Sequence, residues 1–458
     1  MRANRDRAFY SKLIHLTLPM ALQNLMLASV AAADAFMLGR LDQNAMAAVS
    51  QASQVQFLQN LFMTVGAGAG AILGAQYWGK GDKRTVGNVF CIMLRLCGGV
   101  SLMTFLACAL IPGALMRILT NDAQLIALGT GYLRLAAWSY LCTGISHCYL
   151  SIMKVSDHAA SSAIISSTAV VLNIALNAVF IFGLLGVPAM GIMGAALATL
   201  ISRVAELLMA VLLSLKKDYI APPLRCLLRM IGALEKDYWR VCLPLLGGAL
   251  LWGVGFSSYT AIMGHLGADA AAANSIVAVL RDLICCFCSG VGSAAAIMVG
   301  NELGAGRLEK GRLYGDRLMK LSFAVGLASA LAVLLIVPPC TRFVKLSEVG
   351  RGYLRGMIIV LAVYMIGRSF SSVVINGIFA AGGDTLFDVY SLAATMWGIA
   401  IPLALLGAFV FHWPVVAVYA CTCLDEVGLM PWTMLHYRKH KWVRDLTRDA
   451  VTQTQGGE

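Results

Sequence analysis

The sequence predicts an all-α membrane protein with twelve transmembrane helices in two pseudo-symmetric six-helix lobes. Its 458 residues are 59% hydrophobic and 13% charged, and that charged fraction is about half of what soluble proteins carry. Continuous apolar windows of about 20 residues recur along the chain, and each is long enough to cross a bilayer as a helix. A membrane β-barrel would instead show short runs of alternating hydrophobicity. The windows lie at 14–38, 52–76, 86–111, 123–150, 159–183, 190–214, 239–263, 271–300, 317–340, 352–379, 386–411 and 414–437.

The distribution of positive charge predicts the topology. When successive loops are assigned to alternate sides, the side with both termini holds 24 Lys and Arg residues and the other side holds 6. Cytoplasmic loops of membrane proteins carry such an excess of Lys and Arg. We therefore expect a multi-pass protein of the cell membrane with both termini in the cytoplasm. The net charge of +12 then reflects topology, and no nucleic-acid partner is expected.

The N-terminus and the cysteines have ordinary explanations. The segments "MRANRDR" and "AAADA", with apolar residues between them, resemble a cleavable signal peptide. The apolar run continues to Leu38 and eleven further windows follow, so we expect the first transmembrane helix here. The 13 cysteines lie almost wholly in the windows, and "CCFC" and "CTC" lack His or carboxylate companions. We expect no disulfide framework, no firm metal site and no cofactor.

The two halves of the chain repeat one another. Residues 19–50 align without gaps on residues 244–275, at an offset of 225, and the match continues into the next loop. Further along, "KVSDH" (154–158) aligns with "AAGGD" (380–384) at an offset of 226. Six spans in each half give both halves the same orientation, as in parallel transporter repeats. Matched positions are Pro19 with Pro244, Asp34 with Tyr259, Gln76 with Asn301, and Gly79 with Gly304.

The repeat predicts the domain organisation. Residues 1–215 form an N-terminal six-helix lobe and residues 239–440 form a C-terminal one. The basic segment 216–238 is a cytoplasmic linker, in which residues 224–234 are amphipathic enough to rest on the membrane surface. Residues 441–458 form a cytoplasmic tail. Two six-helix bundles that meet at a cavity are a common plan for transporters.

Asp34 is an acidic residue inside the first apolar window. Ionisable groups at membrane depth are costly, so they usually have functional or paired roles. Gln23 lies eleven residues earlier, about three turns, and shares its helix face. Asn173 and Asn177 are four residues apart and share a face of the fifth span.

The sixth span carries a matching polar stripe. Ala195, Thr199, Arg203 and Glu206 lie along one face. Counted at about 1.5 Å per residue, Asp34, the two asparagines and Thr199 all lie in the outer half of the bilayer. A carboxylate with amide and hydroxyl oxygens suits H⁺ or Na⁺, because hard cations take oxygen ligands. The alternative is a hydrogen-bonded Asp that only ties helices together. The expected coupling residues are Asp34, Asn173, Asn177, Thr199 and Ala195, and a Na⁺ site would use the first four.

Other polar residues in the spans are candidates for lining a cavity or contacting substrate. Gln56 and Asn60 share a face of the second span, although their spacing also suits helix–helix hydrogen bonds. Arg281 and Asp282 lie near the middle of the eighth span, and pairing of Asp282 with Arg368 of the tenth span is one alternative. A structural ion pair and a substrate or gating role both stay open. The candidates are Gln23, Gln56, Asn60, Arg281, Asp282 and Arg368.

Several stretches, in order and in both halves, resemble the multidrug and toxic compound extrusion (MATE) family over about residues 10–445. They are "DAFMLGRLDQNAMAAVS", "AQYWGKGD", "LNIALNAVFIFGLLGVPAMGIMGAALATLISR", "VGNELGAGRLEKGR", "GIFAAGGDT" and "WGIAIPLALLGAF". The resemblance implies two six-helix lobes around a central cavity and export driven by entry of H⁺ or Na⁺. In members with a cation site in the N-terminal lobe, the carboxylate of the first helix matches Asp34. Their pair in the fifth helix matches Asn173 and Asn177, and their hydroxyl in the sixth helix matches Thr199.

The sequence departs from the family pattern at Lys154 and Ala380 and at two positions that bear on ion coupling. Asn177 stands where members with that site often have Asp, so strong Na⁺ binding is not expected. Ala249 stands where many members have a Glu in the seventh helix, which argues against a carboxylate-coupled site in the C-terminal lobe. Coupling is therefore expected to depend mainly on Asp34, with H⁺ favoured over Na⁺.

The expected function is a secondary antiporter that exports amphipathic, cationic organic compounds. Its expected partners are these small molecules and the lipid bilayer, with no obligate protein partner. A flippase for a lipid-linked saccharide is an alternative of related architecture, for which Arg134, Arg281 and Arg368 would supply a cationic cavity. A membrane-embedded enzyme is not expected, because no GxSxG or HExxH motif occurs in the sequence.

Overall fold

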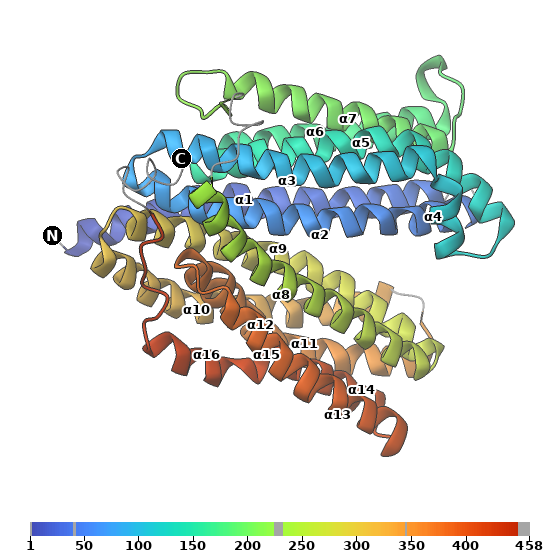
Figure 1. Ribbon diagram of the computed structural model, residues 1–458. Coiled ribbons are helices and arrows are strands. Elements are labelled where there is room, and N and C mark those ends of the chain that lie inside the picture. Colours follow the sequence, from blue (N-terminus) through green and yellow to red (C-terminus); the bar gives the residue numbers. More distant parts are fainter. Residues whose placement is uncertain (1, 40–42, 224–231, 344–345, 448–458) are drawn as a thin grey trace. The chain divides into compact units, whose positions relative to one another are not determined.

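The structure, a computed structural model, describes residues 2–39, 43–223, 232–343 and 346–447 (Figure 1). Helices joined by loops make up these ranges, which contain no β-strand, and this confirms the predicted all-α class. Most of the predicted amphipathic stretch 224–234 lies outside the described residues. The first half comprises α1 (Arg2–Gly39), α2 (Gln43–Lys80), α3 (Lys83–Leu110), α4 (Pro112–Leu119), α5 (Ala123–Val155), α6 (Ala159–Phe182), the 3₁₀ turn Leu184–Gly186 and α7 (Ile192–Ser214).

The second half follows the same plan with more interruptions. It comprises α8 (Gly232–His265), α9 (Ala268–Gly304), α10 (Leu308–Phe343), α11 (Glu348–Val373) with the π-helical turn Val374–Phe379, α12 (Leu386–Leu392), α13 (Ile401–Leu405), α14 (Val415–Thr422), α15 (Leu424–Val427) and α16 (Leu429–Arg438). Each of the twelve predicted windows corresponds to one helix or to a run of consecutive helices.

Eleven helical stretches of the described residues are long and apolar enough to cross a membrane. The predicted window 123–150 is the one not among them. It corresponds to α5, whose 33 residues are long enough to cross a bilayer.

The predicted window 386–411 is a single helical path with wide turns. π-helical segments at Ala393–Ala400 and Leu406–Val410 flank α13. Pro402 lies in the first turn of α13 and has no N–H for the helical ladder. π-helical turns of this kind are frequent at functional sites.

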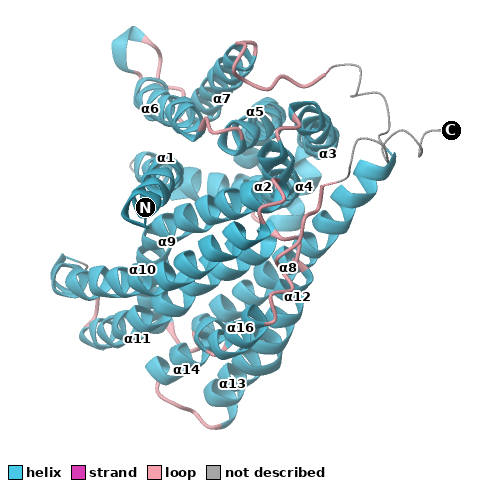
Figure 2. Ribbon diagram, turned by 90° about the vertical axis from the view of Figure 1, so that its left-hand side faces the viewer, coloured by secondary structure: helices cyan, strands magenta, loops and turns pink. Residues whose placement is uncertain are grey.

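The described chain forms two compact units. The N-terminal unit holds Leu22–Gly74 and Asp82–Trp239, and the C-terminal unit holds Met1–Ala21, Ala75–Gly81 and Arg240–Arg448. Within the first, α3 packs on α5, α5 on α7, and α7 on α6 (Figure 2). Within the second, α11 packs against both α9 and α10 (Figure 2). The lobe boundaries expected from the repeat stay predictions.

Two repeat-related glycines allow a close helix crossing in the C-terminal unit. A Cβ on Gly79, near the end of α2, would lie 1.9 Å from the carbonyl oxygen of Asn301 on α9. A Cβ on Gly304 would lie equally close, at 1.9 Å, to the carbonyl oxygen of Gln76. The two contacts are therefore images of one another under the 225-residue offset. Only glycine permits backbones to approach this closely.

Candidate functional site: a polar chain around Asp34

Asp34 begins a chain of hydrogen bonds that joins three helices of the N-terminal unit. The Asn177 amide donates to Asp34 Oδ1 (2.5 Å) and also lies 3.2 Å from Asn173 Oδ1. Asn173 Nδ2 donates to Thr199 Oγ1 (3.3 Å). Thr199 Oγ1 in turn donates to the carbonyl oxygen of Ala195 (2.9 Å). The five residues expected to couple the ion are thus placed together on α1, α6 and α7.

The burial of these groups shapes their chemistry. Asn177 has no exposed surface and Asn173 only 4%, whereas Asp34 and Thr199 are half-buried. The Oδ1 atom of Asn177 is buried and has no hydrogen-bond partner among the described residues. A buried amide oxygen without a partner is costly. A donor or a cation beside Asp34 would satisfy it.

The coupling residues supply only one carboxylate to this chain. Within the described residues, no group of three or more His, Cys, Asp and Glu side chains could hold a metal ion. One carboxylate with two amides and a hydroxyl offers hydrogen-bond partners and a single negative charge. This arrangement can take up a proton, or it can bind a monovalent cation with modest affinity.

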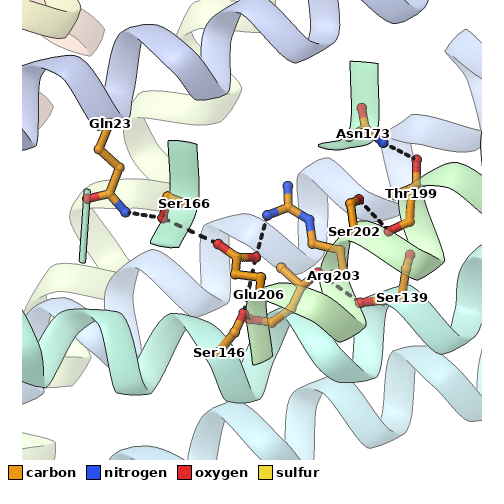
Figure 3. A network of polar contacts seen from close by, with 10 residues as sticks. Gln23, Ser139, Ser146, Ser166, Asn173, Thr199, Ser202, Arg203 and Glu206 are labelled. Carbon is orange, nitrogen blue, oxygen red and sulfur yellow. Dashed lines mark hydrogen bonds and ion pairs between the residues drawn. The ribbon is translucent and has the colours of Figure 1, made fainter. Parts of the chain in front are cut away.

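A second polar network lies nearby in the same unit, centred on Glu206 of α7 (Figure 3). Glu206 is only 2% exposed and pairs with Arg203 at 2.7 Å. Its carboxylate also accepts from Ser166 (3.3 Å) and Ser146 (3.5 Å). Gln23 of α1 donates to the same Ser166 (2.7 Å). Gln23 therefore joins this network.

The position of Glu206 at the centre of this network was not predicted from the sequence. Its position on the Thr199 stripe was evident from helical spacing, but its partners come from α5 and α6. Spacing within one helix does not report such partners. A Glu three residues after an Arg within an apolar span is the sequence signal that points to it.

The candidates on α2 do not form one group. Gln56 is half-buried and Asn60 is exposed. The neighbouring Gln59, only 2% exposed, donates to Ser101 Oγ (3.0 Å) and to the carbonyl oxygen of Tyr140 (2.8 Å). The polar stripe of this helix therefore includes a helix–helix tie at Gln59.

The charged candidates of the C-terminal unit form two separate ion pairs. Arg281 pairs with its neighbour Asp282 at 2.9 Å. Arg368 pairs with Glu426 of α15 at 2.6 Å. The alternative pairing of Arg368 with Asp282 is therefore wrong, because α11 packs against α15 and places Glu426 beside Arg368.

Comparison with known proteins agrees with this architecture. The sequence model of the MatE family matches residues 19–179 and 244–406, two segments whose starts differ by 244 − 19 = 225 residues, the offset of the repeat. The probable multidrug resistance protein NorM of Bradyrhizobium diazoefficiens is 26% identical over 86% of both chains. The uncharacterized transporter YisQ of Bacillus subtilis is 23% identical over 92% of both chains.

Solved structures share the fold. A point mutant of the Vibrio cholerae MATE transporter VcmN matches with a TM-score of 0.86 and 17% identity, over 96% of this chain and 98% of that one. A MOP superfamily transporter from Pyrococcus furiosus matches with a TM-score of 0.82 and 20% identity, over 96% of each chain. Members of the matched family are transporters, which sets the membrane-enzyme alternative aside. Given the family match over both halves, the chain belongs to the MatE family of multi-pass membrane transporters.

Proposed function

We propose that the protein is a secondary antiporter of the cell membrane that exports cationic amphipathic organic compounds in exchange for H⁺. The observation that carries the proposal is the chain from Asp34 through Asn177 and Asn173 to Thr199. The printed names of relatives such as NorM, a probable multidrug resistance protein, support an organic substrate. Both termini lie in the cytoplasm, as the distribution of Lys and Arg favours.

Protonation changes what Asp34 can do in this chain. As a carboxylate, it accepts a hydrogen bond from the Asn177 amide. A proton on Asp34 removes its charge and makes one of its oxygens a donor. The unpartnered Oδ1 of Asn177 is the acceptor available in the same side chain. Proton uptake therefore reorganises the contact between α1 and α6.

Helix α1 has a point at which that reorganisation can become a bend. Pro19 lies inside α1, fifteen residues before Asp34. Proline removes one backbone N–H from the helical ladder and weakens the helix at that turn. A ligand shifts a conformational equilibrium by as much as its affinities for the two states differ. Proton and substrate therefore drive export by favouring different conformations.

H⁺ is favoured over Na⁺ by the charge of the site. The chain around Asp34 contains one carboxylate, and Asn177 and Asn173 contribute uncharged amides. Na⁺ in a dry site needs several oxygen ligands and charge compensation, whereas a proton needs one carboxylate and one acceptor.

The lipid-linked saccharide alternative loses support from the ion pairs. A phosphate headgroup needs cationic side chains that are free to bind it. Two of the three arginines expected to line such a cavity, Arg281 and Arg368, are each held by a carboxylate, at 2.9 Å and 2.6 Å, and the third, Arg134, is exposed.

Transport in proteoliposomes tests the proposal. We would measure tetraphenylphosphonium uptake under an imposed ΔpH or an imposed Na⁺ gradient. The proteins compared are wild type, Asp34→Asn and the control variant Glu309→Gln, which changes an exposed acid on α10. We expect ΔpH to drive uptake by wild type and the control, and Asp34→Asn to behave as protein-free liposomes. Full ΔpH-driven uptake by Asp34→Asn would contradict the role of this carboxylate. Uptake driven by Na⁺ alone would contradict the choice of ion.

A further inference from the structure

A second group of buried acids lies in the C-terminal unit. Asp425 and Glu426 of α15 are each 7% exposed. Tyr259 of α8, itself 8% exposed, donates to Asp425 Oδ2 (3.3 Å). The Glu426 amide donates to Asp425 Oδ1 (2.8 Å), and Arg368 pairs with Glu426 Oε1 (2.6 Å). Residues from α8, α11 and α15 thus meet at one point.

A third acid approaches the same point from α12. Asp388 interacts electrostatically with both Glu426 and Arg368. Its Oδ2 lies 2.6 Å from where a Cβ of Gly248 on α8 would stand. Helix α8, the seventh span, has no carboxylate at Ala249. It packs instead against the carboxylate of Asp388, which α12 supplies.

The charges of this group do not balance. Arg368 pairs with Glu426 and interacts electrostatically with Asp388 and Asp425, so one guanidinium stands against three carboxylates. Arg281, the nearby second arginine, already pairs with Asp282. Negative charge at membrane depth requires a compensating cation or protons.

An unpartnered atom marks where a compensating group would bind. Glu426 Oε2 is buried and has no hydrogen-bond partner among the described residues, although the other oxygen of the same carboxylate is paired. A carboxylate oxygen left in this state inside a protein is costly. A cationic ligand at this oxygen would remove both the cost and the charge imbalance.

Aromatic rings indicate the class of that cation. Tyr259, Tyr364 and Tyr419 are each at most 9% exposed and interact with Asp425. Phe256 lies edge-on to Tyr259 with ring centroids 6.4 Å apart and stacks with Trp252 at 5.3 Å, and the Arg281 guanidinium lies 4.3 Å above the Phe256 ring. Carboxylates combined with aromatic faces suit organic ammonium and phosphonium ions through cation–π attraction. In the described residues, the acids do not form a cluster that could hold a metal ion.

The repeat shows how this group relates to Asp34. Tyr259 is the counterpart of Asp34 (34 + 225 = 259), and Asp425 is the counterpart of Thr199 at the second offset (199 + 226 = 425). The acid and the hydroxyl have therefore exchanged helices between the two units. In the N-terminal unit the acid is on the first helix of the repeat, and in the C-terminal unit it is on the last.

We propose that Tyr259, Asp425 and Glu426 form a binding site for the positively charged group of an organic cation, separate from the coupling site at Asp34. The site rests on the proposed function in that it gives the exporter a place to recognise its substrate. Asp34 takes up the proton, and the acids of α15 take the cationic head. The negative charge of the two sites therefore serves two different ligands.

Binding to the purified full-length protein in lipid nanodiscs tests this site. Titration calorimetry measures tetraphenylphosphonium, with tetraphenylborate as an anion of the same shape. The variants are Asp425→Asn, Glu426→Gln and Tyr259→Phe, with Asp34→Asn and the exposed Glu309→Gln for comparison. Thermal unfolding and size-exclusion profiles establish that each variant is folded.

We expect the cation to bind wild type and the anion not to bind. Asp425→Asn and Glu426→Gln should each weaken cation binding by about tenfold or more, because each removes a desolvated charge. Tyr259→Phe removes only a hydroxyl donor and should weaken it by about threefold. If Asp425→Asn does not fold, Tyr259→Phe and Glu426→Gln decide the question.

The outcomes separate this inference from the coupling proposal. Asp34→Asn should still bind tetraphenylphosphonium, with an affinity that no longer changes with pH because the exchanged proton is missing, and it should lose ΔpH-driven uptake. Unchanged affinity in the α15 variants, equal binding of the anion, or no cation binding to wild type would overturn the C-terminal site. ΔpH-driven uptake that survives in Asp34→Asn would overturn the coupling role and leave the C-terminal site standing.

Discussion

Replacement of Gly304 by alanine should disrupt the helix crossing between α2 and α9. The new Cβ would lie 1.9 Å from the carbonyl oxygen of Gln76, where real Cβ contacts stay beyond 3.0 Å. The neighbouring backbone must therefore move by at least 3.0 − 1.9 = 1.1 Å. Gly79→Ala meets the Asn301 carbonyl at the same distance of 1.9 Å and should behave alike.

The magnitude follows from comparison with a glycine in open space. Overpacking in a tight interior costs about 1–3 kcal/mol. Alanine in a helix is favoured over glycine by about 1 kcal/mol, and this gain applies equally at Gly99 of α3, where a Cβ would meet nothing within 4 Å. The difference between Gly304→Ala and Gly99→Ala therefore isolates the overpacking, and we expect Gly304→Ala to be the less stable by about 1–3 kcal/mol.

Thermal unfolding in detergent, followed by circular dichroism and by fluorescence, measures the comparison. We expect Gly304→Ala and Gly79→Ala to unfold at lower temperature than wild type, and Gly99→Ala at the same or a higher temperature. Equal unfolding temperatures for Gly304→Ala and Gly99→Ala would refute the close crossing.

Three further predictions follow from buried contacts. Trp442 has no exposed surface, so its replacement by alanine should lower the unfolding free energy by about 3–5 kcal/mol. Thermal unfolding measures this loss, and an unchanged transition would contradict the packing of Trp442. Glu206→Gln should destabilise by about 3–5 kcal/mol because Arg203 loses its buried partner, and Arg203→Met combined with Glu206→Leu should recover much of that loss in the same assay. Asn177→Asp adds a second carboxylate beside Asp34, so uptake should gain dependence on a Na⁺ gradient; uptake that stays indifferent to Na⁺ would contradict the charge argument for ion choice.

Much of this fold is predictable from the sequence, because a bilayer imposes a simple rule. Each span must be a long apolar helix, and every predicted window corresponds to helix in the structure. The wide turns around α13 were not foreseen, because π-helical turns leave no distinct composition. The short helix α4 also lay below the length that apolar windows detect.

The grouping around Asp34 was predictable because depth and helix face can be counted. Asp34, Asn177 and Asn173 meet as their positions along the helices imply. Pairings between distant helices were not predictable in this way. Arg368 finds Glu426 rather than Asp282, and Tyr259 finds Asp425, because the packing of α8, α11 and α15 decides which side chains meet.

Proton release on substrate binding tests the central claim most directly. Tetraphenylphosphonium is added to the purified protein in weakly buffered nanodiscs, and the pH change is recorded for wild type, Asp34→Asn and Glu309→Gln. If Asp34 carries the exchanged proton, wild type and Glu309→Gln release protons on binding and Asp34→Asn releases none. Equal proton release from Asp34→Asn and wild type would contradict the account.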